Sequence, residues 1–83
     1  MKHFEYTPKG VCSRRMIFDI NDDDTIASLE VIGGCNGNLK GISALVKGRP
    51  VDEVISDLEG ITCGPKPTSC PDQIAHALKA YKG

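Results

Sequence analysis

Four cysteines in turn-forming surroundings are the residues best placed to do chemistry. Each has a glycine or proline within two residues. A cysteine kept for packing is expected inside an apolar run, because a free thiol behaves as a small hydrophobe. Turn residues instead let the backbone approach closely and direct side chains to one point. Four thiolates at one point suit zinc, with an iron–sulfur cluster as the alternative. The predicted metal ligands are Cys12, Cys35, Cys63 and Cys70.

The spacing of the cysteines leaves other interpretations open. The gaps between them hold 22, 27 and 6 residues, so the C-x-x-C pairs typical of zinc knuckles are absent. Reactive or redox-active thiols are a second interpretation. Independently of this, Cys63 could be a free thiol in a spacer loop. Two disulfides in a small secreted domain are a third. Residues 1–5 have no apolar run behind their charge, so no signal peptide is expected.

Length and composition predict a single domain, 1–83, with a thin core. Ten basic against eleven acidic residues give no electrostatic footprint for nucleic acid. No apolar stretch approaches the roughly 20 residues that span a bilayer, so we expect a cytoplasmic protein. Four aromatic residues make a small core, which a metal or a homo-oligomer interface would stabilise. Ser13, Ser43 and Ser69 lack a histidine–acid partnership, so hydrolysis is not expected.

The first half of the chain has the two-residue period of strands. Residues 15–20 alternate and predict a strand, and residues 25–32 predict its return strand. The acidic turn 21–24 lacks the glycine and closing glutamate of a calcium loop, so it predicts a hairpin. Phe4 and Tyr6 add a short edge strand. The core-facing residues of the first strand are expected to be Met16, Phe18 and Ile20. On the second strand, one face is expected to carry Ala27, Leu29 and Val31, and the other Ile26, Ser28, Glu30 and Ile32.

The second half has the period of helices. The first helix is expected to end at Gly48, the second to run from Pro50 to Gly60, and the third to begin at Cys70. Strands followed by helices predict an α+β fold, a small antiparallel sheet of about three strands with three helices on one face. The apolar stripes are Leu39, Ile42, Leu45 and Val46, then Val51, Val54, Ile55 and Leu58, then Ile74, Leu78 and Tyr81.

These elements give the cysteines different local settings. Cys35 precedes the first helix and Cys70 opens the third. Helix N-termini stabilise negative charge, so these two thiols are expected to bind metal or react most readily. Cys12 precedes the first long strand, and Cys63 lies in the proline-rich connection to the third helix. We expect the four to meet at one edge of the sheet.

Thr68-Ser69-Cys70-Pro71-Asp72 spells the TSCPD signature. Together with Gly34-Cys35-Asn36-Gly37-Asn38, the four-cysteine layout and the length, the chain resembles the small stand-alone TSCPD-domain proteins. Related domains stand at the C-terminal end of cobalamin-dependent ribonucleotide reductases. The resemblance implies a link to deoxyribonucleotide supply and a ribonucleotide reductase, or another larger enzyme, as partner. A domain of this size cannot also enclose a nucleotide pocket and a radical cofactor, so we expect an accessory domain and not a complete ribonucleoside-diphosphate reductase.

A second resemblance, from Arg15 to Lys82, is to U-type iron–sulfur scaffold proteins. It implies that Cys12, Cys35 and Cys70 occupy the three scaffold-cysteine positions. Arg14 replaces the scaffold's aspartate, Ser69 replaces its histidine, and Cys63 is an additional thiol. A labile cluster needs an exchangeable position, whereas four thiolates close a tetrahedral site. The scaffold fold is therefore expected, with scaffold or carrier activity as the alternative function.

Overall fold

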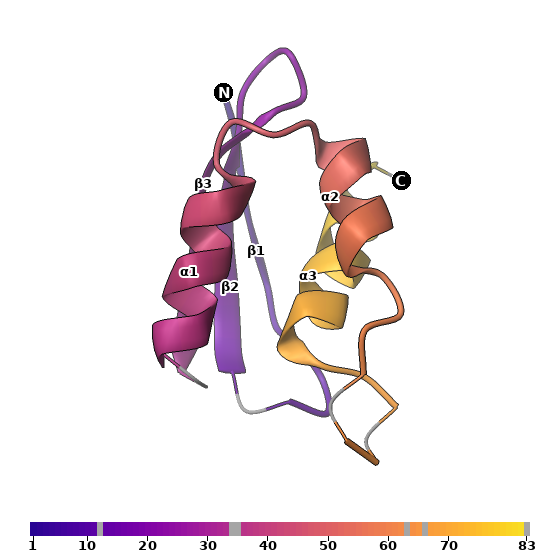
Figure 1. Ribbon diagram of the computed structural model, residues 1–83. Coiled ribbons are helices and arrows are strands. Elements are labelled where there is room, and N and C mark those ends of the chain that lie inside the picture. Colours follow the sequence, from indigo (N-terminus) through magenta and orange to yellow (C-terminus); the bar gives the residue numbers. More distant parts are fainter. Residues whose placement is uncertain (12, 34–35, 63, 66, 83) are drawn as a thin grey trace.

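A three-stranded antiparallel sheet with three helices forms the protein. The computed structural model describes residues 1–11, 13–33, 36–62, 64–65 and 67–82. The strands lie in the order β1-β2-β3, and Figure 1 shows the helices packed on one face, α1 at one side and α2 with α3 at the other. This confirms the predicted α+β class. The elements are β1 (Lys2–Tyr6), β2 (Ser13–Ile20), β3 (Ile26–Gly33), α1 (Asn36–Val46), α2 (Val51–Leu58) and α3 (Cys70–Lys82).

The acidic segment between β2 and β3 is a turn, as predicted. The Asn21 backbone N–H donates to the Thr25 carbonyl at 2.8 Å, and the Asp24 N–H donates to the Asn21 carbonyl at 2.9 Å. Asp24 adopts a φ of 66°, in the left-handed region that aspartate tolerates better than most residues. The Asp23 carboxylate accepts the Thr25 hydroxyl at 2.6 Å. The Asp23 side chain therefore serves the turn itself, whereas the Asp22 carboxylate binds the N-terminal ammonium group.

The pairing of β2 with β3 shifts register in two places, and both shifts change which side chains face the helices. Asp19 pairs with Ser28 but Ile20 pairs with Ile26, so β3 carries one extra residue, Ala27. Such a bulge reverses the alternation beyond it. Ile26 consequently joins Leu29 on the buried face. The predicted alternation, which places Ala27 with Leu29 on one face and Ile26 on the opposite face, is wrong for this reason.

The second shift lies at the start of β2. Ser13 pairs with Gly33 and Arg15 pairs with Ile32, so Arg14 is the extra residue. In a regular strand Ser13 would share the outward face of Arg15. The inserted residue turns Ser13 to the helix-covered face, where it is only 4% exposed.

The core lies between the sheet and the helices. Met16, Phe18 and Ile20 are fully buried, which confirms the predicted inner face of β2. Phe4 of β1 stacks on Phe18 at 4.6 Å and on Tyr81 of α3 at 4.9 Å between ring centroids. This aromatic stack joins the edge strand to the last helix. The core cluster is completed by Ile26, Leu29, Val46, Val51, Val54, Ile74, Ala77 and Leu78.

The helices follow the predicted stripes except at one residue. Leu39 and Val46 of α1 are buried, but Leu45 is 74% exposed. At about 100° per residue, Leu45 lies roughly 120° around the helix from Leu39 and so leaves the buried side. Gly48 and Gly60 follow α1 and α2 with φ of +83° and +84°, which confirms them as helix stops.

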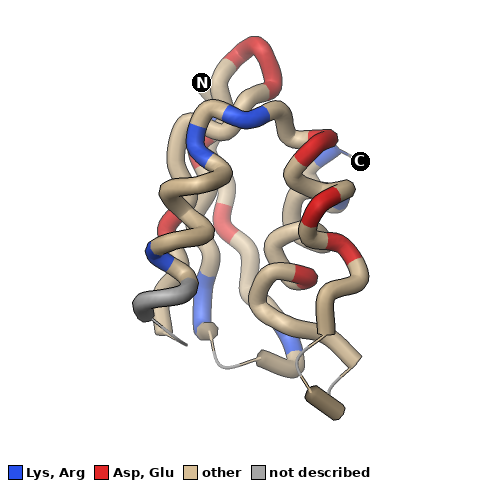
Figure 2. Tube along the Cα trace, viewed as in Figure 1, with Lys and Arg blue, Asp and Glu red and all other residues tan. Residues whose placement is uncertain are grey.

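Charged residues cover the surface away from the core. Figure 2 shows acidic positions on the β2–β3 turn and along α2, with basic positions in the connection between α1 and α2. Arg49 in that connection pairs with Asp57 of α2, and Lys82 of α3 pairs with Asp24 of the turn. On the uncovered sheet face, Asp19 accepts hydrogen bonds from Ser28 at 2.8 Å and contacts His3 Nδ1 at 2.7 Å. None of the helices in the described ranges is long and apolar enough to cross a membrane.

Two leucines on different helices test this arrangement of the core with the same substitution. Leu78→Ala on α3 removes a fully buried side chain, so we expect the free energy of unfolding to fall by about 3 kcal/mol. Leu45→Ala on α1 removes a side chain that is mostly in water, and we expect a change within about 0.5 kcal/mol. Urea unfolding followed by circular dichroism measures both. Equal losses for the two variants would contradict the packing described.

Candidate functional site

Cys70 is the predicted ligand that the structure describes. It is the first residue of α3, as predicted, and its side chain is half-buried. The predicted ligands Cys12, Cys35 and Cys63 lie outside the described residues. Within residues 1–11, 13–33, 36–62, 64–65 and 67–82, no three histidine, cysteine or acidic side chains gather as metal ligands would. The meeting of the four thiols therefore stays a prediction.

Ser69 caps the helix that Cys70 opens. Its hydroxyl accepts a hydrogen bond from the Asp72 N–H at 3.2 Å, and its carbonyl accepts one from the Gln73 N–H at 2.9 Å. This is the usual N-cap arrangement, in which a serine oxygen satisfies a helical N–H that has no partner within the helix. The same hydroxyl donates to the carbonyl of Ile61. Ser69 thus sets the start of α3 against Ile61, near the beginning of the α2–α3 connection.

Asp72 makes a second connection to that segment. Its carboxylate is 5% exposed and accepts hydrogen bonds from the Thr68 hydroxyl and from the Gly60 N–H at 2.8 Å. His76 Nε2 lies 3.1 Å from the same carboxylate. The Thr68 hydroxyl, then the Gly60 N–H, hold the pKa of Asp72 below its usual value, and His76 lowers it further. The charge also lies in the first turn of α3, where the helix dipole favours it.

Gln73, just beyond the signature, ties α3 to the chain before β2. Its side-chain Nε2 donates to the Thr68 hydroxyl at 3.0 Å, and its Oε1 accepts the Lys9 backbone N–H at 3.0 Å. The side chain is only 7% exposed. The sequence analysis did not single out Gln73, because a glutamine that bonds to distant backbone leaves no periodic or motif signal.

The Cys70 thiol faces the start of β2. Its Sγ lies 3.4 Å from the hydroxyl oxygen of Ser13, across 57 positions of sequence. Thr68, Ser69 and Asp72 of the signature are occupied in holding the start of α3, whereas Cys70 points at another element. Sequence reasoning considered Ser13 for hydrolysis alone and missed this contact, because the inserted Arg14 that turns Ser13 inward has no sequence signal.

Several chain segments meet at this end of the molecule. β2 and α3 begin here, and β3 ends here beside the first turn of α1, at the lower end in Figure 1. Ser13 pairs with Gly33, and a Cβ at Gly10 would lie 3.4 Å from the methyl group of Thr68. The segment before β2, the end of β3 and the start of α3 are therefore neighbours.

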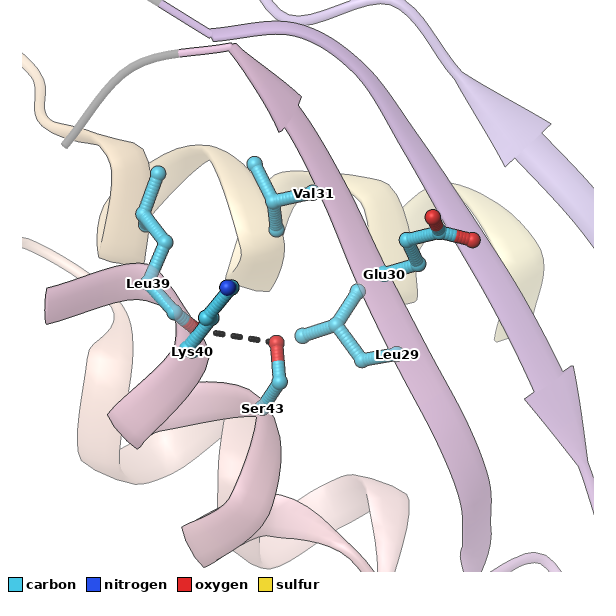
Figure 3. A pocket seen from close by; sticks show the side chains of 6 residues that line it. All are labelled: Leu29, Glu30, Val31, Leu39, Lys40 and Ser43. Carbon is cyan, nitrogen blue, oxygen red and sulfur yellow. Dashed lines mark hydrogen bonds between the residues drawn. The ribbon is translucent and has the colours of Figure 1, made fainter. Parts of the chain in front are cut away.

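A shallow pocket of about 200 Å³ lies elsewhere, between β3 and α1. Figure 3 shows Leu29 and Val31 of β3 facing Leu39 of α1, with Glu30 and Lys40 at the borders. The Ser43 hydroxyl in its wall donates to the Leu39 carbonyl at 2.9 Å. The pocket thus combines three apolar side chains with Glu30, Lys40 and an engaged hydroxyl, whereas the Cys70 end carries a predicted metal ligand and is taken as the candidate site.

Comparison with known proteins identifies one family. The family model for the TSCPD domain matches residues 1–82. No curated protein and no solved structure shows a significant match to the chain. The resemblance to U-type iron–sulfur scaffolds is therefore still a prediction.

Replacing the Asp72 carboxylate tests its structural role. Asp72→Asn should lower the free energy of unfolding by about 2 kcal/mol, because its amide N–H₂ cannot accept the bonds that the carboxylate accepts. Asp52→Asn is the matched control, since the Asp52 side chain is 77% exposed, and we expect a change within about 0.5 kcal/mol. Denaturant unfolding at pH 7 measures both. A loss no greater than that of the control would refute the role.

The same pair of variants predicts a pH dependence. The folded-state pKa of Asp72 is lowered, so its contribution to stability is fully present above the unfolded value of about 3.9 and is lost as pH falls through the folded value. Asp72→Asn should therefore lose less stability than the wild type between about pH 5 and pH 2. If the free energies of unfolding of the two proteins fell in parallel across that pH range, the prediction would be contradicted.

Proposed function

The chain belongs to the TSCPD-domain family, and we propose that it is a four-cysteine metal-binding accessory domain linked to ribonucleotide reduction. The proposed ligands are Cys12, Cys35, Cys63 and Cys70, and the proposed metal is zinc. One observation carries the metal site: Cys70 lies where described neighbours of the other three cysteines come together.

The neighbours of Cys12 and Cys35 approach Cys70 from the sheet. Ser13 follows Cys12 directly, and its hydroxyl oxygen lies 3.4 Å from the Cys70 sulfur. Gly33 precedes Cys35 by two residues and pairs with Ser13. Consecutive Cα atoms are about 3.8 Å apart, so a sequence separation of one or two residues supports the proposal that Cys12 and Cys35 bind the same metal as Cys70.

The neighbours of Cys63 approach from the α2–α3 connection. Ile61, two residues before Cys63, accepts a hydrogen bond from the Ser69 hydroxyl. Ser69 in turn precedes Cys70, and the Gly60 N–H donates to Asp72. The connection is thus held against the start of α3 immediately before Cys63. This favours Cys63 as the fourth ligand over a thiol in a detached loop.

The four proposed sulfur ligands limit which metal centres the site can hold. Four cysteine sulfurs suit zinc or an iron–sulfur cluster, and a zinc site closed by four thiolates is structural because no position stays open for substrate. The position of Cys70 at the start of α3 agrees with this choice, since a helix dipole favours negative charge at its N-terminus and a zinc-bound cysteine is a thiolate. When bound, zinc would supply cross-linking of strand, loop and helix to a small core.

The family membership supports the link to ribonucleotide reduction, and the size of the chain supports an accessory role. A reductase must hold a nucleotide and a radical-generating cofactor in an enclosed site. The core here is a single layer between three strands and three helices. The pocket between β3 and α1 has a volume of about 200 Å³, which is smaller than the 300–1,000 Å³ of typical small-molecule sites. We therefore propose that the domain works in the cytoplasm with a larger enzyme.

Metal analysis of protein purified without oxygen tests the site. We expect one zinc per chain and no colour, whereas a brown protein with iron and sulfide would favour the iron–sulfur alternative. Chelation should lower stability, since a free zinc concentration 100 times the Kd contributes about 2.7 kcal/mol. Elemental analysis and thermal unfolding provide the measurements.

Single substitutions then test the ligands. Cys70→Ser, and the same change at each of the other three cysteines, should weaken zinc binding strongly because serine is a poor zinc ligand. Ser43→Ala, in the wall of the β3–α1 pocket, is the control and should bind zinc as the wild type does. A wild type that takes up no metal, or a Cys70→Ser variant with unchanged affinity, would contradict the site.

Activity and binding assays test the biological role. The pure chain, given a thiol reductant, cobalamin and a ribonucleotide, should form no deoxyribonucleotide, because a domain of this size is too small to enclose all of these molecules together. Added to the ribonucleotide reductase of the same cell, it should bind with saturable affinity in a pull-down or calorimetric titration. Turnover by the chain alone would refute the accessory role, and the absence of binding to that reductase would refute the association.

A further inference from the structure

The buried hydroxyl of Ser13 is the strongest feature that the proposed function does not yet use. Ser13 is 4% exposed, and its oxygen has a hydrogen-bond contact with Cys70 Sγ at 3.4 Å. Within the described residues, every buried side-chain nitrogen or oxygen has a hydrogen-bond partner. For Ser13, this partner is the sulfur of Cys70.

Burying a hydroxyl is unfavourable unless a good partner compensates for the lost water. A neutral thiol is a poor one, because its S–H is a weak donor and its sulfur a weak acceptor. A thiolate is a much stronger acceptor, since a hydrogen bond to a charged group is about twice as strong as one between neutral groups. The Ser13 hydroxyl is therefore better matched to a charged sulfur than to a thiol.

The neighbouring hydroxyls are engaged elsewhere. Thr68 donates to the Asp72 carboxylate, and Ser69 donates to the Ile61 carbonyl. Ser13 reaches Cys70 because the inserted Arg14 turns it to the covered face of the sheet. Among the described residues, Ser13 is thus the hydroxyl available to the Cys70 sulfur.

We infer that Ser13 is a positioning residue for the metal site, donating a hydrogen bond to the Cys70 sulfur once that sulfur has lost its proton to bind zinc. This inference rests on the proposed function. A thiolate has no proton to donate, so the hydroxyl must be the donor in the metal-bound state. Partners of this kind orient a ligand and tune its electron donation, and removing one typically costs 10- to 100-fold in metal affinity.

The test compares zinc affinities by competition with a coloured chelator. Ser13→Ala should bind zinc about 10-fold more weakly than the wild type, at the lower end of the range for such partners because sulfur is a diffuse acceptor. Ser43→Ala removes a hydroxyl that bonds within α1, and its affinity should equal that of the wild type. Ser13→Thr keeps the hydroxyl and should stay within about twofold of the wild type.

Cobalt(II) in place of zinc gives a readout that a purely structural role would not change. Loss of a hydrogen bond raises the energy of the sulfur electrons, so the sulfur-to-cobalt charge-transfer band of Ser13→Ala should move to longer wavelength, with Ser13→Thr near the wild type. Circular dichroism of the metal-free proteins checks that the variants are folded, and if Ser13→Ala is not, Ser13→Val, which has the shape of Ser13→Thr without the hydroxyl, replaces it.

The outcomes separate the two claims. Unchanged affinity, or weaker affinity with an unchanged band, would overturn the role of Ser13 and leave the metal site standing. A wild type that binds neither zinc nor cobalt would overturn the proposed function and this inference with it.

Discussion

The buried carboxylate of Asp72 holds together the end of the molecule on which the function depends. It accepts the backbone N–H of Gly60 and the hydroxyl of Thr68, and it lies 3.1 Å from His76. A carboxylate buried this fully is tolerated because hydrogen bonds and the helix dipole compensate for the lost water. The end of α2, the connection after it and the start of α3 are fixed relative to one another as a result. The direction of Cys70 follows from that placement.

The start of β2 faces the start of α3, and a register shift in the sheet places it there. The extra residue Arg14 turns Ser13 toward the helices, opposite Cys70. Gln73 completes the arrangement by binding the Lys9 backbone N–H, which brings the chain before β2 to α3. The chain before β2, the Gly60–Ile61 segment and the start of α3 are thereby held together by Gln73, Asp72 and Ser69, and the start of β2 adds the contact of Ser13 with the Cys70 sulfur. In the part of the chain that the structure describes, Thr68, Ser69 and Asp72 hold the start of α3 while Cys70 faces β2, and this division of roles supports the proposed metal site.

Periodicity alone predicted most of the fold. The buried stripe Ile74 and Leu78 on α3, the inner face of β2 and the helix stops at Gly48 and Gly60 are all as predicted, because each depends on local residue pattern. The errors at Ala27 and Ile26 come from a bulge, and a bulge is decided by pairing with another strand and not by the strand itself. Leu45 was misplaced because the predicted stripe was too wide for the side of α1 that the sheet covers.

The candidate site was less predictable than the fold. The TSCPD signature located the start of α3 and its cysteine, but could not distinguish its structural members, Ser69 and Asp72, from Cys70. The contact with Ser13 spans 57 positions and depends on a register shift, so no local pattern contains it. The single-domain organisation and the full ligand set are still predictions.

X-ray absorption at the zinc edge tests the central claim most directly, because it reports which atoms surround the metal. With zinc bound to the intact chain, the account predicts a first shell of four sulfur atoms at about 2.3 Å, the distance typical of zinc–thiolate bonds. A shell that contains nitrogen or oxygen at about 2.0–2.1 Å would contradict it, since the four cysteines would then not form the site.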